Sequence, residues 1–197
     1  PAGSTTYTVT VTSVNGCTAT ASTTITVNPL PAAAISVAET SGTTNDDGII
    51  CAGATVVLTA SGGGTYAWST GATTPAISVT PGGTTTYTVT VTSISGCTAT
   101  ASTTITVNPI PTAGITVSET SGTTPNDGII CSGSTVTLTG TGGGTYAWST
   151  GATTDTLQNL APGQYSVSIT DAANCPEIQT FTITEPQLRF LSENNIF

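Results

Sequence analysis

The chain has 197 residues and a formal net charge of −9, with one Lys or Arg, ten Asp or Glu and no His. Phosphate backbones and acidic membrane surfaces are held through many cationic side chains, so this composition excludes nucleic acid as a partner and disfavours acidic membrane surfaces. No apolar run approaches the roughly 18 residues that a membrane-spanning helix needs.

Polarity in this chain comes from Thr, Ser and Gly, because charged residues make up only 6% and hydrophobic residues 37%. Disordered segments usually have the opposite balance, with high charge and few apolar residues. Thr, Val, Ile and Tyr favour the pleated, half-buried surface of a β-sheet. The composition therefore predicts an all-β protein.

The sequence repeats itself with a period of 80 residues. Residues 12–29 return almost unchanged as residues 92–109 (92 − 12 = 80), and GGGTYAWSTGATT occurs at 62–74 and again at 142–154 (142 − 62 = 80). Eighty residues is too long for one turn of a solenoid and suits a small domain with its own core.

Two proline pairs, in NPLP and NPIP, each follow a strand-like segment and resist both helix and central sheet, so we place linkers there. Residues 1–28 are then the C-terminal part of an incomplete repeat, and 29–108 are a complete repeat. Residues 109–186 form a third repeat, and 187–197 are a tail or the start of the next module.

Within the complete repeat, alternation of apolar and polar residues predicts short strands separated by Gly-rich turns. The expected strands are 34–39, 55–60, 65–69, 76–80, 86–92 and 98–107. This number of strands in about 80 residues predicts tandem immunoglobulin-like (PKD-like) β-sandwich domains. In the strand 86–92, Tyr87, Val89 and Val91 share one face and are expected to point inward.

Each later repeat has one tryptophan, Trp68 or Trp148, in a predicted central strand. Sandwiches of this kind often bury a tryptophan there. The alternative is an exposed aromatic platform for sugar rings. We expect both to be core residues.

The third repeat resembles a known family of surface repeats. WSTGATTDTLQNLAPGQYSVSITDAANC at 148–175 and ITEP at 183–186 are similar to the SprB-type repeat of large adhesins from gliding Bacteroidota. The earlier repeats, with ICAGATVVLTASGGGTYAWSTG and TYTVTVTSISGC, resemble the PKD-like and immunoglobulin-like repeats of the same secreted proteins. The central repeat departs from the SprB pattern, with Ser93 where the last repeat has Asp171. The resemblance implies secretion, often by the type IX system, and a place at the cell surface.

Five cysteines recur in phase with the repeat, which suits an oxidised, extracellular protein better than a metal site. Pairing within repeats would join Cys51 to Cys97 and Cys131 to Cys175, leaving Cys17 unpaired. In a plain immunoglobulin topology those partners lie at opposite ends, so domains stacked head to tail would instead bring Cys51 near Cys175. We favour pairing within repeats.

Acidic residues gather upstream of two of these cysteines, at Glu39, Asp46 and Asp47 and again at Glu119 and Asp127. Asp-Asp-Gly and Asn-Asp-Gly are tight-turn signals, so a purely structural role is one interpretation. The other is a calcium site near a domain junction, made of hard oxygen ligands. No other cofactor is expected.

Asp46 with Asp47, or Glu119 with Asp127, could be taken for a glycosidase pair, but nothing in a repeated turn sets acid and base apart across a cleft. We therefore expect no enzymatic activity. DTL at 155–157 resembles the O-glycan acceptor motif of Bacteroidota, which makes Thr156 a glycosylation candidate.

These features together predict a structural stalk or fibre repeat of an extracellular bacterial surface adhesin, which presents binding surfaces away from the cell. Its partners would be neighbouring repeats or identical subunits. Residues 1–28 supply only two strands and cannot bury a core alone. We expect the rest of this repeat to precede them in a longer chain. One alternative is a self-assembling filament subunit, in which another molecule supplies the missing strands by strand complementation. Another is a carbohydrate-binding module for surface glycans, which needs Trp68 and Trp148 exposed.

Overall fold

The computed structural model describes residues 1–122 and 124–186. Every regular element in this part of the chain is a β-strand, which confirms the all-β prediction, and none of it forms a helix that could cross a membrane. The strands are β1 (Thr5–Thr12), β2 (Thr18–Ile25), β3 (Ala34–Ala38), β4 (Ile49–Cys51), β5 (Val56–Ser61), β6 (Thr65–Trp68), β7 (Ala76–Val79), β8 (Thr85–Thr92), β9 (Thr98–Asn108), β10 (Gly114–Ser118), β11 (Val136–Thr141), β12 (Thr145–Trp148), β13 (Thr156–Leu160), β14 (Gly163–Thr170) and β15 (Pro176–Ile183).

Contacts divide the chain into two compact units, each described here by itself. The first contains Pro1–Glu39 and Thr55–Ile105, and the second contains Thr40–Ala54 together with the described residues from Thr106 onward. The segment 40–54 therefore belongs to the repeat 29–108 by sequence but to the second unit by contacts. The boundaries expected at the proline pairs stay predictions.

In the first unit, β3, β5 and β7 form one antiparallel sheet and β6, β8 and β9 form another. Alternate residues of each strand point inward, as in β5, where Val56 and Leu58 are buried and Val57 is exposed. Val89 and Val91 of β8 are fully buried, as their spacing predicted. Two facing sheets with this strand order are an immunoglobulin-like sandwich.

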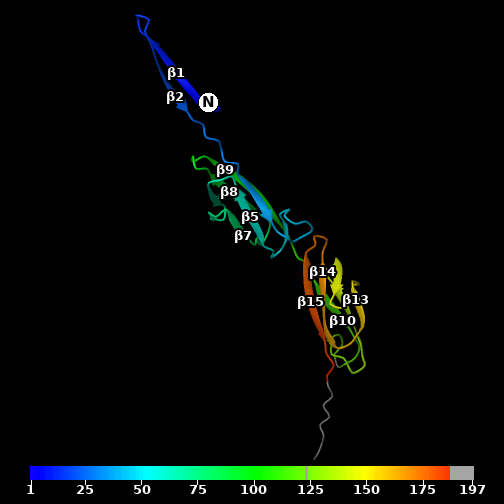
Figure 1. Ribbon diagram of the computed structural model, residues 1–197. Helices are drawn as coiled ribbons and strands as arrows, with labels where there is room; N and C mark the ends of the chain where they lie inside the picture. The colour runs from blue at the N-terminus through cyan, green and yellow to red at the C-terminus, as the bar shows by residue number, and fades with distance from the viewer. Residues whose placement is uncertain (123, 187–197) are drawn as a thin grey trace, which may run out of the picture. The chain divides into compact units, whose positions relative to one another are not determined.

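The second unit repeats this arrangement with the sheets β10-β11-β13 and β12-β14-β15, which Figure 1 shows side by side. Its core consists of buried apolar side chains contributed by both sheets and by the loop before β11. They are Ile130, Val136, Leu138, Trp148, Leu157, Val167, Ile169 and Ile183. Tyr165, near the start of β14, donates a hydrogen bond of 3.0 Å from its hydroxyl to the Ala161 carbonyl oxygen, a contact of the tyrosine-corner type.

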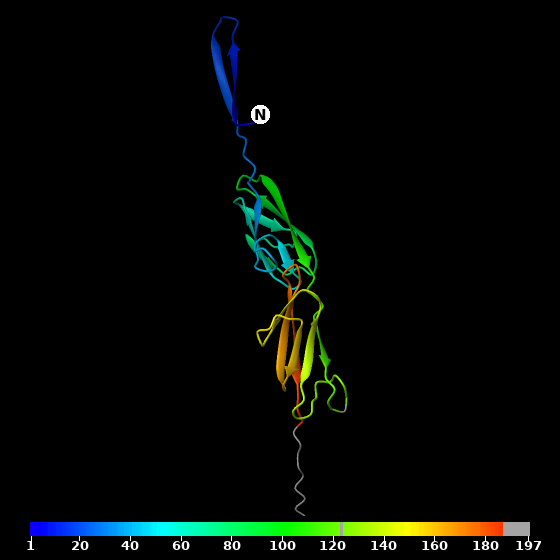
Figure 2. The ribbon, with the colours of Figure 1, turned by 90° about the vertical axis from the view of Figure 1, so that its right-hand side faces the viewer.

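The hairpin of β1 and β2 has the same sequence pattern as β8 and β9 but forms only a two-stranded sheet, drawn in blue in Figure 2. Tyr7, Val9 and Val11 are 51%, 58% and 62% exposed, whereas the equivalent residues of β8 are 7% exposed or less. The apolar face that forms a core in the complete repeat is thus exposed in the hairpin.

Candidate functional site

The structure contains one disulfide bond among its described residues, between Cys51 and Cys175. Their Cα atoms lie 5.5 Å apart, and 124 positions separate them in the sequence. Both side chains are buried. By the 80-residue period Cys51 belongs to the repeat 29–108 and Cys175 to the next, so this bond joins successive repeats.

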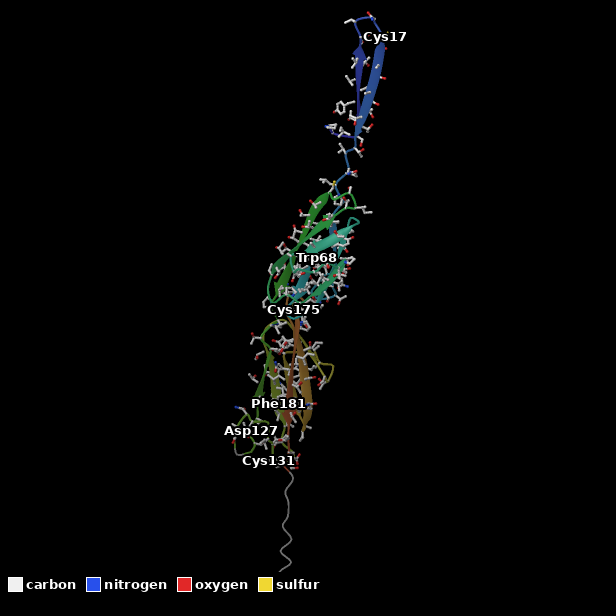
Figure 3. The ribbon with its side chains drawn as sticks, turned by 90° about the vertical axis from the view of Figure 1, so that its left-hand side faces the viewer. Cys17, Trp68, Asp127, Cys131, Cys175 and Phe181 are labelled. Atoms are coloured by element: carbon white, nitrogen blue, oxygen red, sulfur yellow. A yellow bond between two sulfur atoms is a disulfide. The ribbon has the colours of Figure 1, made fainter. Side chains whose placement is uncertain are left out.

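The favoured pairing of Cys51 with Cys97 and Cys131 with Cys175 is therefore wrong, and the alternative pairing of Cys51 with Cys175 is the one that forms. Cys175 lies just before β15, whereas the segment that leads into Cys131 bridges to Thr184 just after β15. Nine residues (184 − 175 = 9) of extended strand span about 30 Å, but a disulfide needs Cα atoms within about 7 Å. Figure 3 shows Cys131 and Cys175 at opposite ends of this unit, with Phe181 of β15 between them.

A tight turn holds Cys175 in place. The Asp171 carboxylate accepts hydrogen bonds of 2.9 Å from the backbone N–H groups of Ala173 and Cys175. Asn174 has a φ of 58°, a left-handed conformation that Asn adopts more readily than most residues. Ser13 and Ser93 accept the equivalent hydrogen bond from Cys17 and Cys97. Asp171 was noticed in the sequence only as a departure from Ser, but these bonds give it a local structural role.

The loop before Cys51 forms the other side of the disulfide site. Cys51 donates its backbone N–H to Ser41 Oγ at 3.3 Å, and β4 pairs in parallel with the last three residues of β9. The Asn174 side chain donates a hydrogen bond of 2.7 Å to the Gly42 carbonyl oxygen. Sequence analysis did not single out Asn174 or Gly42, because neither differs from an ordinary turn residue.

The remaining cysteines are free thiols: Cys17 and Cys131 are exposed and Cys97 is half-buried. Cys17 lies at the tip of the β1–β2 hairpin (Figure 3). Cys17 was expected to be unpaired, whereas Cys97 and Cys131 were expected to form bonds within their own repeats.

The acidic loops are compact turns around a buried carboxylate. Glu39 and Glu119 are both buried. The two oxygens of Glu119 accept backbone N–H groups from Ser121 at 2.9 Å and Asp127 at 3.2 Å, and the Asp127 carboxylate accepts that of Ile129 at 2.8 Å. These bonds support the structural interpretation of the loop.

Calcium binding at these loops stays a prediction. Within residues 1–122 and 124–186, no three Asp, Glu, His or Cys side chains lie close enough together to hold a metal ion. In the first copy of the loop, Asp47 accepts the backbone N–H of Ile49 at 2.7 Å, and Asp46 has a φ of 63°. The Asp47 and Asp127 carboxylates are thus positioned by their own turns.

Trp68 and Trp148 are core residues, as expected, since each is only 4% exposed. Their indole N–H groups donate hydrogen bonds to the carbonyl oxygens of Thr74 at 2.9 Å and Thr154 at 2.8 Å. A buried indole with a satisfied N–H has no face available for a sugar ring. The tryptophans therefore form no exposed platform.

Thr156 is the first residue of β13 and pairs with Thr139 of β11. It is half-buried, and its carbonyl oxygen accepts a hydrogen bond of 2.8 Å from the Thr154 hydroxyl. Its glycosylation stays a prediction.

No known protein family matches the sequence, and no curated protein matches it either. The chain is similar to solved structures of the following three proteins. Murine CEACAM1b is 12% identical over 78% of this chain and 100% of its own, with a TM-score of 0.34. A 1.5-MDa bacterial ice-binding adhesin is 21% identical over 91% of this chain and 72% of its own, with a TM-score of 0.34. A Ca²⁺-stabilized adhesin of an Antarctic bacterium is 20% identical over 92% of this chain and 56% of its own, with a TM-score of 0.35. Similarity at this level carries no inference about function.

Proposed function

We propose that this chain is a structural stalk or fibre repeat of an extracellular bacterial surface adhesin, with no enzymatic activity of its own. Its sandwiches would serve as folded spacers that present binding surfaces away from the cell. The sequence resemblance to SprB-type and PKD-like repeats supports this proposal, and so does a composition with no His and one cationic side chain.

The single observation that carries the proposal is the disulfide between Cys51 and Cys175. A stalk has to transmit tension along its length. When the chain is pulled from its ends, a covalent bond between these residues transmits the force past everything between them. Strands β5 to β14 lie within that bypassed segment, so tension along the chain does not act on them directly.

The disulfide also supports an extracellular location, because such bonds form and persist in oxidising compartments. It is buried at both cysteines, which shields it from reductants. Export by the type IX system follows only from the family resemblance and belongs to the proposal in the same way.

Single-molecule force spectroscopy of the full chain tests this role. The 124 positions between the bonded cysteines correspond to about 410–450 Å of extended chain at roughly 3.3–3.6 Å per residue. We expect the contour length released on complete unfolding to rise by that amount when the protein is reduced. The double variant Cys51→Ser with Cys175→Ser should release the longer length without reductant. Equal lengths before and after reduction would remove the basis of the proposal.

A second candidate, a filament subunit that uses strand complementation, is favoured by the exposed apolar face of the β1–β2 hairpin. Val9 and Val11 are more than half exposed there. Because a two-stranded hairpin is only marginally stable by itself, further strands that cover this face would stabilise it. Strands from another chain could cover this face as β3, β5 and β7 cover the equivalent face of β8 and β9. A hairpin completed in this way would become as sensitive to core truncation as the complete repeat.

A further inference from the structure

Two free cysteines of this chain lie in the same two structural settings, a loop and a turn, as the bonded pair. Cys131 corresponds to Cys51, since 131 − 51 = 80. Cys17 ends a turn of the same kind as the one that ends at Cys175. The disulfide therefore has a front half, exemplified by Cys51, and a rear half, exemplified by Cys175, and the chain holds one exposed thiol of each kind.

The turn at Cys17 has the hydrogen bonds of the bonded turn. Ser13 donates its N–H to the Cys17 carbonyl oxygen at 2.8 Å, as Asp171 does to that of Cys175 at 3.2 Å. Ser13 Oγ accepts the Cys17 N–H at 3.1 Å, the bond that the Asp171 carboxylate makes in the other turn. Gly16 has a φ of 81°, in the left-handed region that Asn174 also occupies. The rear half is thus already formed before any bond is made.

The loop at Cys131 has the fold of the bonded front half but lacks its cover. Gly122 has a φ of 95° and lies against the Ile129 carbonyl, as Gly42 (φ 88°) lies against that of Ile49. Gly42 is half-buried beneath the turn of Cys175, whereas Gly122 is exposed. Cys51 is 7% exposed and therefore buried, whereas Cys131 is exposed.

A polar atom at the uncovered loop also lacks a partner. Ser121, in the position of Ser41, has its Oγ buried with no hydrogen bond to any described residue. In the bonded half, Ser41 Oγ accepts the Cys51 N–H. Buried polar atoms nearly always have a partner, so the loop at Cys131 differs from the bonded loop in this internal hydrogen bond.

We propose that Cys131 forms an intermolecular disulfide with Cys17 of a second copy of this chain, by the same contact that joins Cys51 to Cys175. Copies would then be linked head to tail into a covalent fibre. Cys97 is the weaker partner because it is half-buried and its sulfur already lies 3.9 Å from the Asn28 carbonyl oxygen. This inference rests on the proposed stalk function and extends it from one chain to a series.

The bond requires an oxidant, for which glutathione disulfide is sufficient. The Cys131 thiolate attacks one sulfur of glutathione disulfide and releases one glutathione thiolate, which leaves a mixed disulfide on Cys131. The Cys17 thiolate of the second copy then attacks the Cys131 sulfur and releases the second glutathione. Two thiols are oxidised to one disulfide, two electrons reduce one glutathione disulfide to two glutathione molecules, and the protons of the thiols pass to solvent.

The test is to incubate the full chain with glutathione disulfide at rising protein concentration and to map the links by mass spectrometry of non-reduced peptides. We expect Cys131–Cys17 to be the main intermolecular link, in a ladder of oligomers that Cys131→Ser and Cys17→Ser each abolish. These side chains are exposed, so neither variant should impair folding. Dominant Cys17–Cys17, Cys131–Cys131 or Cys131–Cys97 links, or a product that stays monomeric, would overturn the proposal.

A gain-of-function variant tests the contact itself. Gly16→Asn gives the turn of Cys17 the side-chain amide that Asn174 donates to the Gly42 carbonyl oxygen in the bonded contact. Its acceptor would be the Gly122 carbonyl oxygen of the second copy, and the left-handed position is one that Asn tolerates. One net hydrogen bond corresponds to a roughly 2- to 12-fold rise in the linked fraction at equilibrium. The matched control, Gly96→Asn, changes the other rear turn and should leave this link unchanged. An equal response to both variants, or to neither, would overturn the assignment of Cys17.

Failure of this inference and failure of the stalk function can be told apart. Force spectroscopy of single chains depends on Cys51 and Cys175 alone and is indifferent to linkage between copies. Linkage between copies depends on Cys131 and Cys17, which are dispensable for the internal bond. A chain that shows the reduction-dependent length but no linked oligomers is a stalk that does not polymerise through its thiols.

Discussion

Truncating the same isoleucine in two copies of one sequence should have very different effects on stability. Ile105 of β9 is fully buried, whereas Ile25 at the equivalent position of β2 is 45% exposed. Ile→Ala removes three carbons, worth about 2.4 kcal/mol at roughly 0.8 kcal/mol per buried methylene. With the cavity that remains, we expect Ile105→Ala to cost about 2–5 kcal/mol. Ile25→Ala leaves no cavity and should stay within about 0.5 kcal/mol.

Differential scanning calorimetry of the oxidised chain is the assay, because a chain of several domains need not unfold in one transition. For a domain of this size, a loss of 1 kcal/mol lowers the Tm by about 4–8 °C, so Ile105→Ala should lower one transition by about 8 °C or more. Ile25→Ala should leave every transition within about 4 °C, as its smaller cost implies. A comparable fall for both variants would refute the reasoning, since it would mean that the hairpin is covered by a core in solution.

Two further substitutions test the turns. Gly64→Ala places a methyl group on the carbonyl oxygen of Thr92 at a φ of 111°, so we expect a loss of stability above about 2 kcal/mol in thermal unfolding. Gly63→Ala is the control: its φ is 72° and nothing lies within 4 Å, so it should cost about 1–2 kcal/mol for the left-handed conformation alone. Equal losses for the two variants would contradict the overlap at Gly64. Glu119→Gln replaces one carboxylate oxygen by an amide donor that faces the backbone N–H of either Ser121 or Asp127. We expect it to lower the free energy of unfolding by about 1–3 kcal/mol, equally in calcium and in chelator. A loss of stability confined to calcium-containing buffer would instead make the carboxylate a metal ligand.

Local sequence patterns predicted the sandwich because each strand's inward face can be identified from its own residues. Val89 and Val91 alternate with Thr, so they are buried whichever sheet lies opposite. Trp68 is predicted as a core residue because sandwiches of this kind often bury one tryptophan in a central strand. The short strand β4 was missed, because three residues are too few for a period and its parallel pairing with β9 depends on residues far along the chain.

The disulfide pairing could not be derived from any one repeat, because it joins two of them. Counting favoured bonds within repeats, since each later repeat has two cysteines. The length of one strand rules out a bond between Cys131 and Cys175, because Cys175 lies before β15 and the segment that leads into Cys131 lies beside the residue after β15. The position of the two cysteines at opposite ends of an immunoglobulin-like domain therefore predicts the pairing better than the number of cysteines in each repeat does.

Pairing between successive repeats accounts for the free cysteines of this chain. If the front cysteine of each repeat bonds to the rear cysteine of the next, any stretch of such an array has an unmatched rear cysteine ahead of it and an unmatched front cysteine behind it. Cys97 and Cys17 are of the rear kind and Cys131 is of the front kind. Each sandwich can then fold around its own core, while resistance to tension comes from bonds that no single repeat can make. A stalk of the proposed kind therefore needs little chemistry from its side chains beyond the thiols, which is consistent with a chain whose polarity comes mainly from Thr, Ser and Gly.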